Sequence, residues 1–235
     1  MMVMDGATSL ATLLGLGFLL GVQHATDADH LAAVSTLASR HRSIVRSALL
    51  GSFWGVGHTL ALLVVGAVSA IVRLTITPAV AQALEELVGV MLIVLGAQVV
   101  VQTLRATTVH RHAHAHGGEA HAHLHVHLGD DAMHAHPHLL RLGARPFLVG
   151  LLHGVAGSAA LTLLVASTES SPLGAALYVV VFGAGSTAGM LVLSGLLGLP
   201  FALASRHSAS LLRWLRLAAG SVSLGLGLWL VRGLL

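Results

Sequence analysis

The sequence predicts an all-α integral membrane protein. Six transmembrane helices would form a 3+3 inverted-topology repeat, with a disordered His-rich cytoplasmic loop between the halves. The first observation is composition: 55% of the residues are hydrophobic and 9% are charged, whereas a soluble domain has about 25% charged residues. The second is length, because apolar stretches repeatedly reach the ~20 residues that a bilayer span needs. These stretches lie near residues 8–38, 47–72, 84–104, 146–168, 172–198 and 208–232.

Composition also limits the chemistry of the chain. It contains no cysteine, which excludes disulfides and thiolate metal sites. All 12 basic residues are arginines, and they lie near the ends of the predicted spans. Because no soluble basic domain exists, we expect the lipid bilayer as a partner and no nucleic acid.

The first stretch, residues 8–38, is too long for one straight span, and we expect it to be tilted or broken around a polar segment. That segment reads His24-Ala-Thr-Asp-Ala-Asp-His30. An aspartate at the centre of a membrane helix costs about 2.5–3.5 kcal/mol, so these groups should face a bundle interior or a water-filled path. Imidazoles and carboxylates are ligands of first-row metals. The segment therefore predicts an intramembrane metal site, with a buried polar network that holds no metal as the alternative.

Helical geometry separates the two aspartates of this segment. On a straight helix, His24, Asp27 and His30 share one stripe, whereas Asp29 falls on the other side. Either the helix is unwound here, or Asp29 orients a ligand and does not bind the metal itself. Carboxylates that accept a histidine N–H are common around metal sites.

Two further histidines lie inside later spans. His58 is near the middle of the stretch 47–72, in Gly55-Val-Gly-His-Thr59, where the flanking glycines would leave it accessible. His153 belongs to the stretch 146–168. Because ionisable residues inside a membrane are by default functional, we expect His58 to be a ligand or part of an ion path, with His153 as a further candidate.

The third and fourth stretches are separated by a polar region, so we divide the chain into regions 1–104, 105–145 and 146–235. The central region cannot bury a core and is expected to be disordered without metal. His-rich tracts are typical of metal binding, and we interpret this one as a metal-collecting or metal-sensing loop, with a solvating linker as the alternative. Its histidines are His110, His112, His114, His116, His121, His123, His125, His127, His134, His136 and His138.

The arginines predict the orientation of the chain. Ten of the 12 lie in or beside the loops of one face, and only Arg73 and Arg232 lie on the other. Loops rich in arginine stay in the cytoplasm. We therefore expect a multi-pass protein of the cell (inner) membrane, with the His-rich loop inside and both termini outside.

The two halves of the chain resemble each other. Residues 18–24 align with residues 147–153, and residues 55–59 align with residues 183–187. Three spans per half would make the second half enter the membrane from the opposite face. Transporters built in this way place their site near the midplane, at the interface of the repeats.

These motifs resemble those of the nickel/cobalt transporter superfamily. The segment from His24 to His30 is similar to its His-x-x-x-x-Asp-His signature, and Gly57-His58-Thr59 is similar to its Gly-His-Ser/Thr signature. The resemblance covers essentially the whole chain and is closest in kind to the short six-span nickel/cobalt efflux and urease-associated permease-like members. It implies that His24, Asp29, His30 and His58 bind and pass Ni²⁺ or Co²⁺. The acidic motifs that eight-span members carry in later helices are missing here, since residues 150–158 contain no carboxylate.

The expected function is therefore transport of Ni²⁺ and/or Co²⁺, with Zn²⁺ or Fe²⁺ as other candidate substrates, and not an enzymatic reaction. Cytoplasmic nickel-handling proteins and a second copy of the chain are the expected partners. Two alternatives stay open: an intramembrane zinc-dependent lipid hydrolase, and a membrane-anchored metal sensor or metallochaperone whose working part is the loop. Import and export are equally compatible with the sequence.

Overall fold

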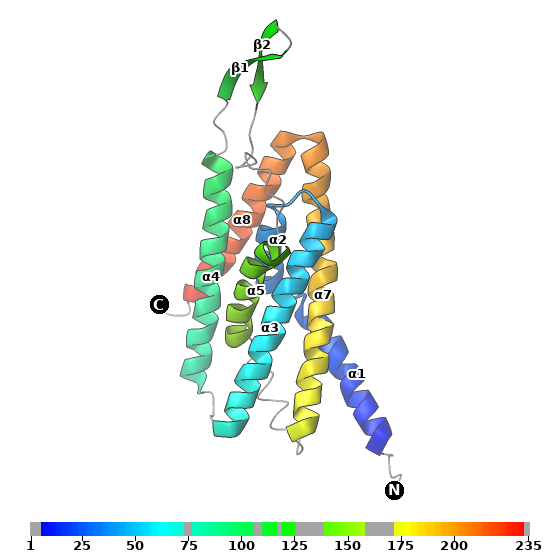
Figure 1. The fold of residues 1–235 in the computed structure, drawn as a ribbon. Coiled ribbons are helices and arrows are strands. Elements are labelled where there is room, and N and C mark those ends of the chain that lie inside the picture. Colours follow the sequence, from blue (N-terminus) through cyan, green and yellow to red (C-terminus); the bar gives the residue numbers. More distant parts are fainter. Residues whose placement is uncertain are drawn as a thin grey trace.

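A computed structural model describes residues 6–72, 77–105, 110–116, 119–125, 139–157 and 172–232 of the chain. These residues form a bundle of long helices with a two-stranded hairpin projecting beyond one end (Figure 1). The helices are α1 (Gly6–His24), α2 (Ala28–Ala38), α3 (Ile44–Val72), α4 (Pro78–Arg105), α5 (Leu139–Gly157), α7 (Pro172–His207) and α8 (Ala209–Val231). The strands are β1 (His110–His116) and β2 (Glu119–His125).

The chain is a membrane protein by the length and apolar character of its helices. Within the described residues, four helical segments are long and apolar enough to cross a bilayer: Ile44–Val68, Pro78–Arg105, Ala176–His207 and Ala209–Val231. The apolar part of α1, Leu14–His24, is shorter. Of the predicted span 146–168, only the part up to Gly157 is described, and α7 continues past the predicted end at residue 198 to His207.

The first predicted stretch is broken into two helices at the polar segment, which confirms one of the two expectations for it. The amide of Asp27 donates to the carbonyl of His24 over 3.1 Å, so the chain turns directly after α1. Asp27 then has an extended backbone, with φ −60° and ψ 147°, and its carbonyl accepts from the amide of Leu31 to begin α2. Aspartate is a favoured N-cap residue because its carboxylate can accept a backbone N–H of the first turn, but here the side chain of Asp27 makes no cap hydrogen bond and faces His24 instead. The break therefore places His24 at the end of one helix and His30 near the start of the next.

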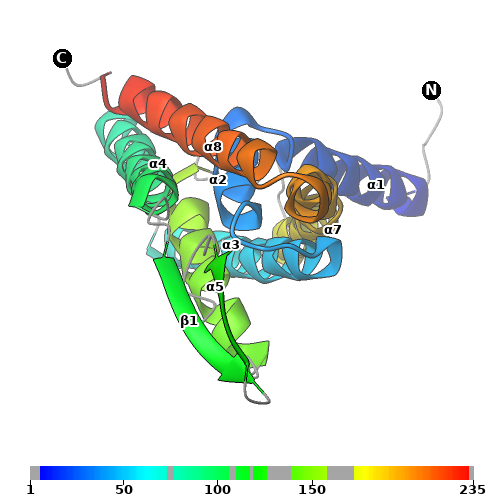
Figure 2. The ribbon, with the colours of Figure 1, turned by 90° about the horizontal axis from the view of Figure 1, so that it is seen from above.

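Helix α2 lies in the middle of the bundle, surrounded by α3, α4, α7 and α8 when the molecule is seen from above (Figure 2). Its alanines are small enough to let these larger helices approach. Ala33 is completely buried and packs in one cluster with Trp54 of α3, Leu92 of α4 and Met190 of α7. The core of the protein is therefore built around the short helix that follows the break.

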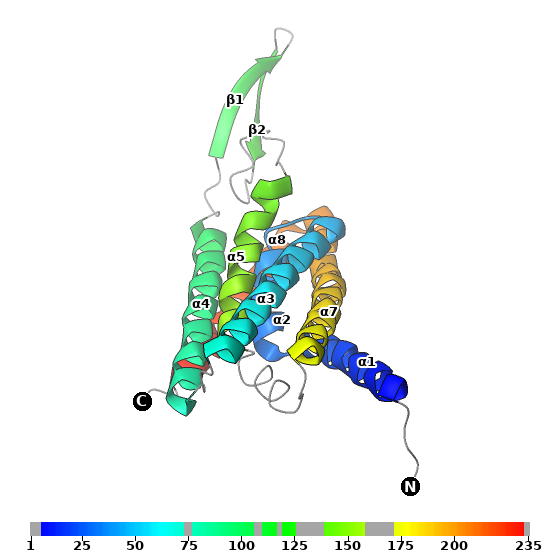
Figure 3. The same cartoon turned by 60° about the horizontal axis from the view of Figure 1, so that its bottom comes forward.

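Glycines allow the closest helix contacts. A Cβ atom at Gly21 of α1 would collide with the carbonyl oxygen of Phe182 in α7, and a Cβ atom at Gly150 of α5 would collide with the carbonyl oxygen of Trp54 in α3. Glycine lets two backbones touch in a membrane, where packing rather than hydrophobic exclusion joins helices. These contacts join α1 to α7 and α5 to α3, and both pairs can be seen side by side in Figure 3.

The expectation of a disordered loop is wrong for part of the His-rich region. Strands β1 and β2 pair antiparallel, with His110 opposite His125, His112 opposite His123, and His114 opposite His121. The alternation of histidine with a second residue type has the period of a β-strand, and antiparallel strands satisfy each other's backbone hydrogen-bonding groups. The sequence argument considered only the missing core and overlooked this period.

Candidate metal centre

The break between α1 and α2 brings two histidines of the first signature together. His24 ends α1 and His30 lies in the first turn of α2, and their ring centroids are 4.5 Å apart. His24 is 7% exposed and His30 is 1% exposed. A continuous helix would hold them nearly two turns apart, so their proximity is a direct consequence of the break.

Two histidines from other helices complete the cluster. His58 of α3 is fully buried, and its Nε2 lies 3.2 Å from Nε2 of His24. His153 of α5 is also fully buried, and its ring centroid is 4.2 Å from that of His30. Since α3 spans residues 44–72, His58 lies midway along a membrane-spanning helix. The predicted candidates from three separate parts of the sequence therefore meet inside the bundle.

Asp29 joins two of these imidazoles. Its Oδ1 is 2.9 Å from Nδ1 of His30 and accepts the backbone N–H of the same residue over 2.8 Å. Its Oδ2 is 2.9 Å from Nε2 of His153. A carboxylate accepts hydrogen bonds, so the two ring nitrogens that face it donate. This arrangement leaves Nε2 of His30 and Nδ1 of His153 as the nitrogens with a free lone pair.

Asp27 holds His24 in the same way but from the surface. Its Oδ2 is 2.8 Å from Nδ1 of His24, while 52% of its side chain is exposed. The second nitrogen of His24, Nε2, is thereby directed at His58. Among the described residues, the buried imidazole nitrogens without a hydrogen-bond partner are His30 Nε2, His58 Nδ1 and His153 Nδ1. Such unpartnered polar atoms are costly in a protein interior, and a bound cation could accept the lone pairs of His30 Nε2 and His153 Nδ1.

Two overlapping sets of residues have metal-ligand geometry. His24, His30 and His58 each offer one ligand atom within 4.8 Å of the others, and so do Asp29, His30 and His153. His30 belongs to both sets. Two nitrogens that each bind one tetrahedral ion at 2.0–2.1 Å are about 3.3 Å apart, which is close to the 3.2 Å between His24 and His58. The cluster can therefore accept a divalent cation with little rearrangement of these two rings.

Trp54 is part of the site although the sequence argument did not select it. It is fully buried, and its ring centroid lies 5.3 Å from that of His30 and 5.4 Å from that of His153. Its position directly before the glycine–histidine motif was the available signal. Its bulk closes this side of the cluster with an apolar wall.

The predicted loop ligands lie elsewhere. His110, His112, His114, His116, His121, His123 and His125 are in β1 and β2, which project beyond the end of the bundle (Figures 1 and 3). The remaining candidates, His127, His134, His136 and His138, are outside the described residues. The intramembrane cluster is thus formed without any of the loop histidines that the structure describes.

The helices and the site define the class of protein: a helical membrane protein with a cluster of buried imidazoles, held by two carboxylates and suited to a divalent transition metal. The chain belongs to the NicO family, whose model, described as high-affinity nickel-transport protein, matches residues 10–228. It is also 37% identical over 200 residues to the urease accessory protein UreH of Bacillus sp. (strain TB-90), a match that covers 84% of this chain and 81% of that protein. No solved structure matches the chain.

Proposed function

We propose that the protein carries Ni²⁺ and/or Co²⁺ across the membrane and that His24, His30 and His58 bind the ion on its way. The observation that carries this proposal is the convergence of three buried imidazoles at the middle of a membrane-spanning helix, with ligand atoms within 4.8 Å of one another. A transport site must bind an ion and also release it. Three neutral nitrogen ligands, with solvent water completing the coordination, would meet that requirement.

Asp27 and Asp29 orient these ligands in the proposed site. Each carboxylate accepts from the Nδ1–H of one histidine, Asp27 from His24 and Asp29 from His30, and so directs the Nε2 lone pair inward. Carboxylates in this position fix the tautomer of a ligand and raise its basicity. His153 is held by the other oxygen of Asp29, and its ring centroid lies 4.2 Å from that of His30, so these two imidazoles would form a second ion position. Because His30 belongs to both positions, an ion could pass between them without leaving the cluster.

The turn between α1 and α2 offers a route to the site. Thr26, Asp27 and Ala28 are exposed, whereas His24 and His30 on either side of them are buried. The negative charge of a half-exposed carboxylate attracts a divalent cation and raises its local concentration. We therefore place one entrance to the site at Asp27.

The architecture that we propose is the inverted 3+3 repeat. The contact of Gly21 with Phe182 has its repeat counterpart in the contact of Gly150 with Trp54, since residues 21 and 54 align with 150 and 182. An axis that relates the halves would pass between residues that align with each other. Thr59 and Thr187 are such a pair, and their Oγ1 atoms are 3.3 Å apart where α3 meets α7. Paired elements around such an axis are typical of secondary transporters.

Ligand chemistry and family membership favour nickel and cobalt. Imidazole-rich sites suit nickel, cobalt and zinc, whereas Cu⁺ prefers the thiolates that this chain does not contain. Membership of a nickel-transport family also favours transport over a zinc-dependent lipid hydrolase. By its likeness to a urease accessory protein, we propose cytoplasmic nickel-handling proteins as partners.

The test is the flux of radioactive nickel into proteoliposomes that contain equal amounts of each variant. Replacing a ligand, in His58→Ala, is expected to lower the flux at least about tenfold, because even residues that only orient a ligand contribute a factor of about 10–100. The control is His207→Ala, which removes an exposed imidazole at the end of α7. Equal flux from wild type and His58→Ala would remove this site from the mechanism.

A second variant separates transport from sensing. Deleting residues 110–138 should leave nickel flux through the bundle and change its concentration dependence. Loss of all flux in a variant that still folds would instead place the working ligands in the loop, as the sensor alternative requires.

A further inference from the structure

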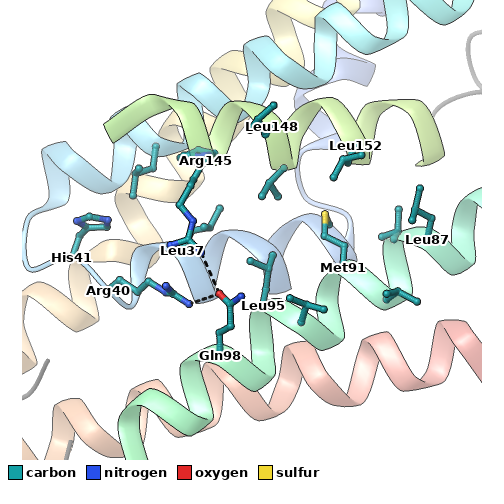
Figure 4. Close-up of a pocket in the computed structure, with 16 residues that line it drawn as sticks. Leu37, Arg40, His41, Leu87, Met91, Leu95, Gln98, Arg145, Leu148 and Leu152 are labelled. Carbon is teal, nitrogen blue, oxygen red and sulfur yellow. Dashed lines mark hydrogen bonds between the residues drawn. The ribbon is translucent and has the colours of Figure 1, made fainter. Parts of the chain in front are cut away.

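A second site lies away from the histidine cluster. A cavity of about 650 Å³ opens between α2, α4 and α5 (Figure 4). Most of its lining is aliphatic, contributed by residues such as Leu37, Met91, Leu95 and Leu152. A volume of this size is in the range of small-molecule sites, about 300–1,000 Å³. The cavity also opens onto the outside of the bundle, since Leu148 and Leu152 of α5 are 56% and 49% exposed.

One end of this cavity is strongly basic. The guanidinium groups of Arg40 and Arg145 converge on one amide, and both donate to Oε1 of Gln98, over 3.1 Å and 3.4 Å (Figure 4). His41 lines the same end. Among the residues that the structure describes, the lining contains no carboxylate, and a single amide oxygen cannot neutralise two cations. The described part of the chain therefore places two arginines together at the end of an apolar cavity with no carboxylate in its lining.

Repulsion between the positive charges at this end of the cavity indicates that an anion would bind there. The pKa of Arg40 is lowered, mainly because the side chain is buried and further because Arg145 and Arg216 carry the same charge. Like charges that approach at the edge of a membrane repel each other more strongly than in water, because the surroundings are less polar. An anion between the guanidinium groups would relieve the repulsion, and phosphate oxygens match the planar fork of arginine.

We propose that this cavity binds one anionic phospholipid. Its phosphate would lie between Arg40 and Arg145, and an acyl chain would fill the aliphatic part along α4 and α5. Basic pockets between membrane helices are known to hold anionic headgroups. A free phosphate ion would use only the basic end and would leave the apolar lining exposed, so the shape and polarity of the cavity favour the lipid.

Such a lipid would tie together the elements that carry the metal site. Arg40 lies two residues after the end of α2, which holds His30, and Arg145 lies on α5, which holds His153. Within the described residues, α2, α4 and α5 all contribute side chains to the lining of this cavity. The lipid would therefore stabilise the packing of these helices at the arginine-rich end of the bundle. This proposal is independent of which metal is carried.

The experiment adds dioleoylphosphatidylglycerol to the purified full-length protein in a neutral detergent and counts bound lipids by native mass spectrometry. Dioleoylphosphatidylcholine serves as the zwitterionic comparison. We expect one phosphatidylglycerol to bind preferentially and to raise the midpoint of thermal unfolding. The variant Arg40→Gln/Arg145→Gln should bind it at least about tenfold more weakly, because it loses two charge-assisted hydrogen-bond donors. The control variant Arg105→Gln/Arg206→Gln removes two exposed arginines that do not line the cavity, and it should bind as wild type does.

Two further measurements keep the proposal testable if the double variant does not fold. Leu148→Trp reduces the aliphatic part of the cavity and should weaken phosphatidylglycerol binding without removing a charge. Inorganic phosphate at equal concentration should neither stabilise the protein nor displace the lipid. Equal binding of phosphatidylglycerol and phosphatidylcholine would overturn the proposal. So would unchanged binding in Leu148→Trp, or stabilisation by inorganic phosphate as large as that by the lipid.

Discussion

Asp29 Oδ2 lies 2.9 Å from Nε2 of His153, although 124 residues separate them in the sequence. The same carboxylate holds Nδ1 of His30 with its other oxygen. Asp29 thus spans two histidines from different helices, and neither of its oxygens is left free in this arrangement. This relationship explains how an aspartate on the opposite side of an ideal helix from His24 and His30 can still belong to the site.

The first prediction concerns Asp29→Asn. The amide keeps one acceptor but can no longer accept from both imidazoles, so their orientation should loosen. We expect nickel flux in proteoliposomes to fall by about 10–100-fold, the usual effect of losing a carboxylate that orients a ligand. X-ray absorption of the nickel-loaded protein should show the same number of histidine ligands as in wild type, measured with residues 110–138 deleted in both. Loss of an oxygen ligand in the variant would mean that Asp29 binds the ion directly.

The second prediction compares two glycine substitutions. Gly150→Ala would place a Cβ atom against the backbone of Trp54, whereas nothing lies within 4 Å of a Cβ atom at Gly225. Overpacking costs about 1–3 kcal/mol, while alanine is better than glycine in a helix by about 1 kcal/mol. We expect Gly150→Ala to lower the midpoint of thermal unfolding and Gly225→Ala to leave it unchanged or raise it. A Gly150→Ala variant as stable as wild type would contradict the close contact of α5 with α3.

The third prediction concerns pH and the loop after α2. Burial lowers the pKa of His41 below its usual 6.5, and the positive charges of Arg46, Arg40 and Arg216 lower it further. Below pH ~6.5 the unfolded chain binds a proton at His41 that the folded protein does not, so stability is lost as the pH falls from the unfolded pKa towards the folded one. We expect the midpoint of thermal unfolding in neutral detergent to fall less between pH 7.5 and pH 5 in His41→Gln than in wild type. Parallel pH profiles for the two proteins would contradict the unfavourable environment of this imidazole.

The fourth prediction concerns orientation. Because the chain contains no cysteine, single cysteines can report which side of the membrane a loop occupies. Thr77→Cys lies before α4, and Ala209→Cys lies at the start of α8, near the arginine-rich end; both positions are exposed. We expect a membrane-impermeant maleimide to label Thr77→Cys in intact spheroplasts and to label Ala209→Cys only after lysis. The reverse pattern would place the arginine-rich face outside.

The sequence by itself determined the membrane class and predicted most residues of the candidate site. Apolar stretches cannot be accommodated in water, and ionisable groups inside a membrane usually have a role, so the spans and the candidates His24, His30 and His58 could be selected from composition and position. The choice of Asp29 over Asp27 as a ligand came from the family resemblance. The period-2 alternation that orders β1 and β2 was also visible, but an argument based only on the missing core passed over it.

Only the tertiary structure decided which of these residues meet. The break at residues 25–27 depends on backbone hydrogen bonds that no spacing rule specifies, and it brings His24 onto His58 and His30 onto His153. The wall formed by Trp54 and the pairing of Arg40 with Arg145 at Gln98 arise from contacts between distant helices. Helical periodicity predicts which face of one helix is polar, whereas the angle and depth at which two helices pack are set by side-chain volumes along both, which one sequence does not reveal.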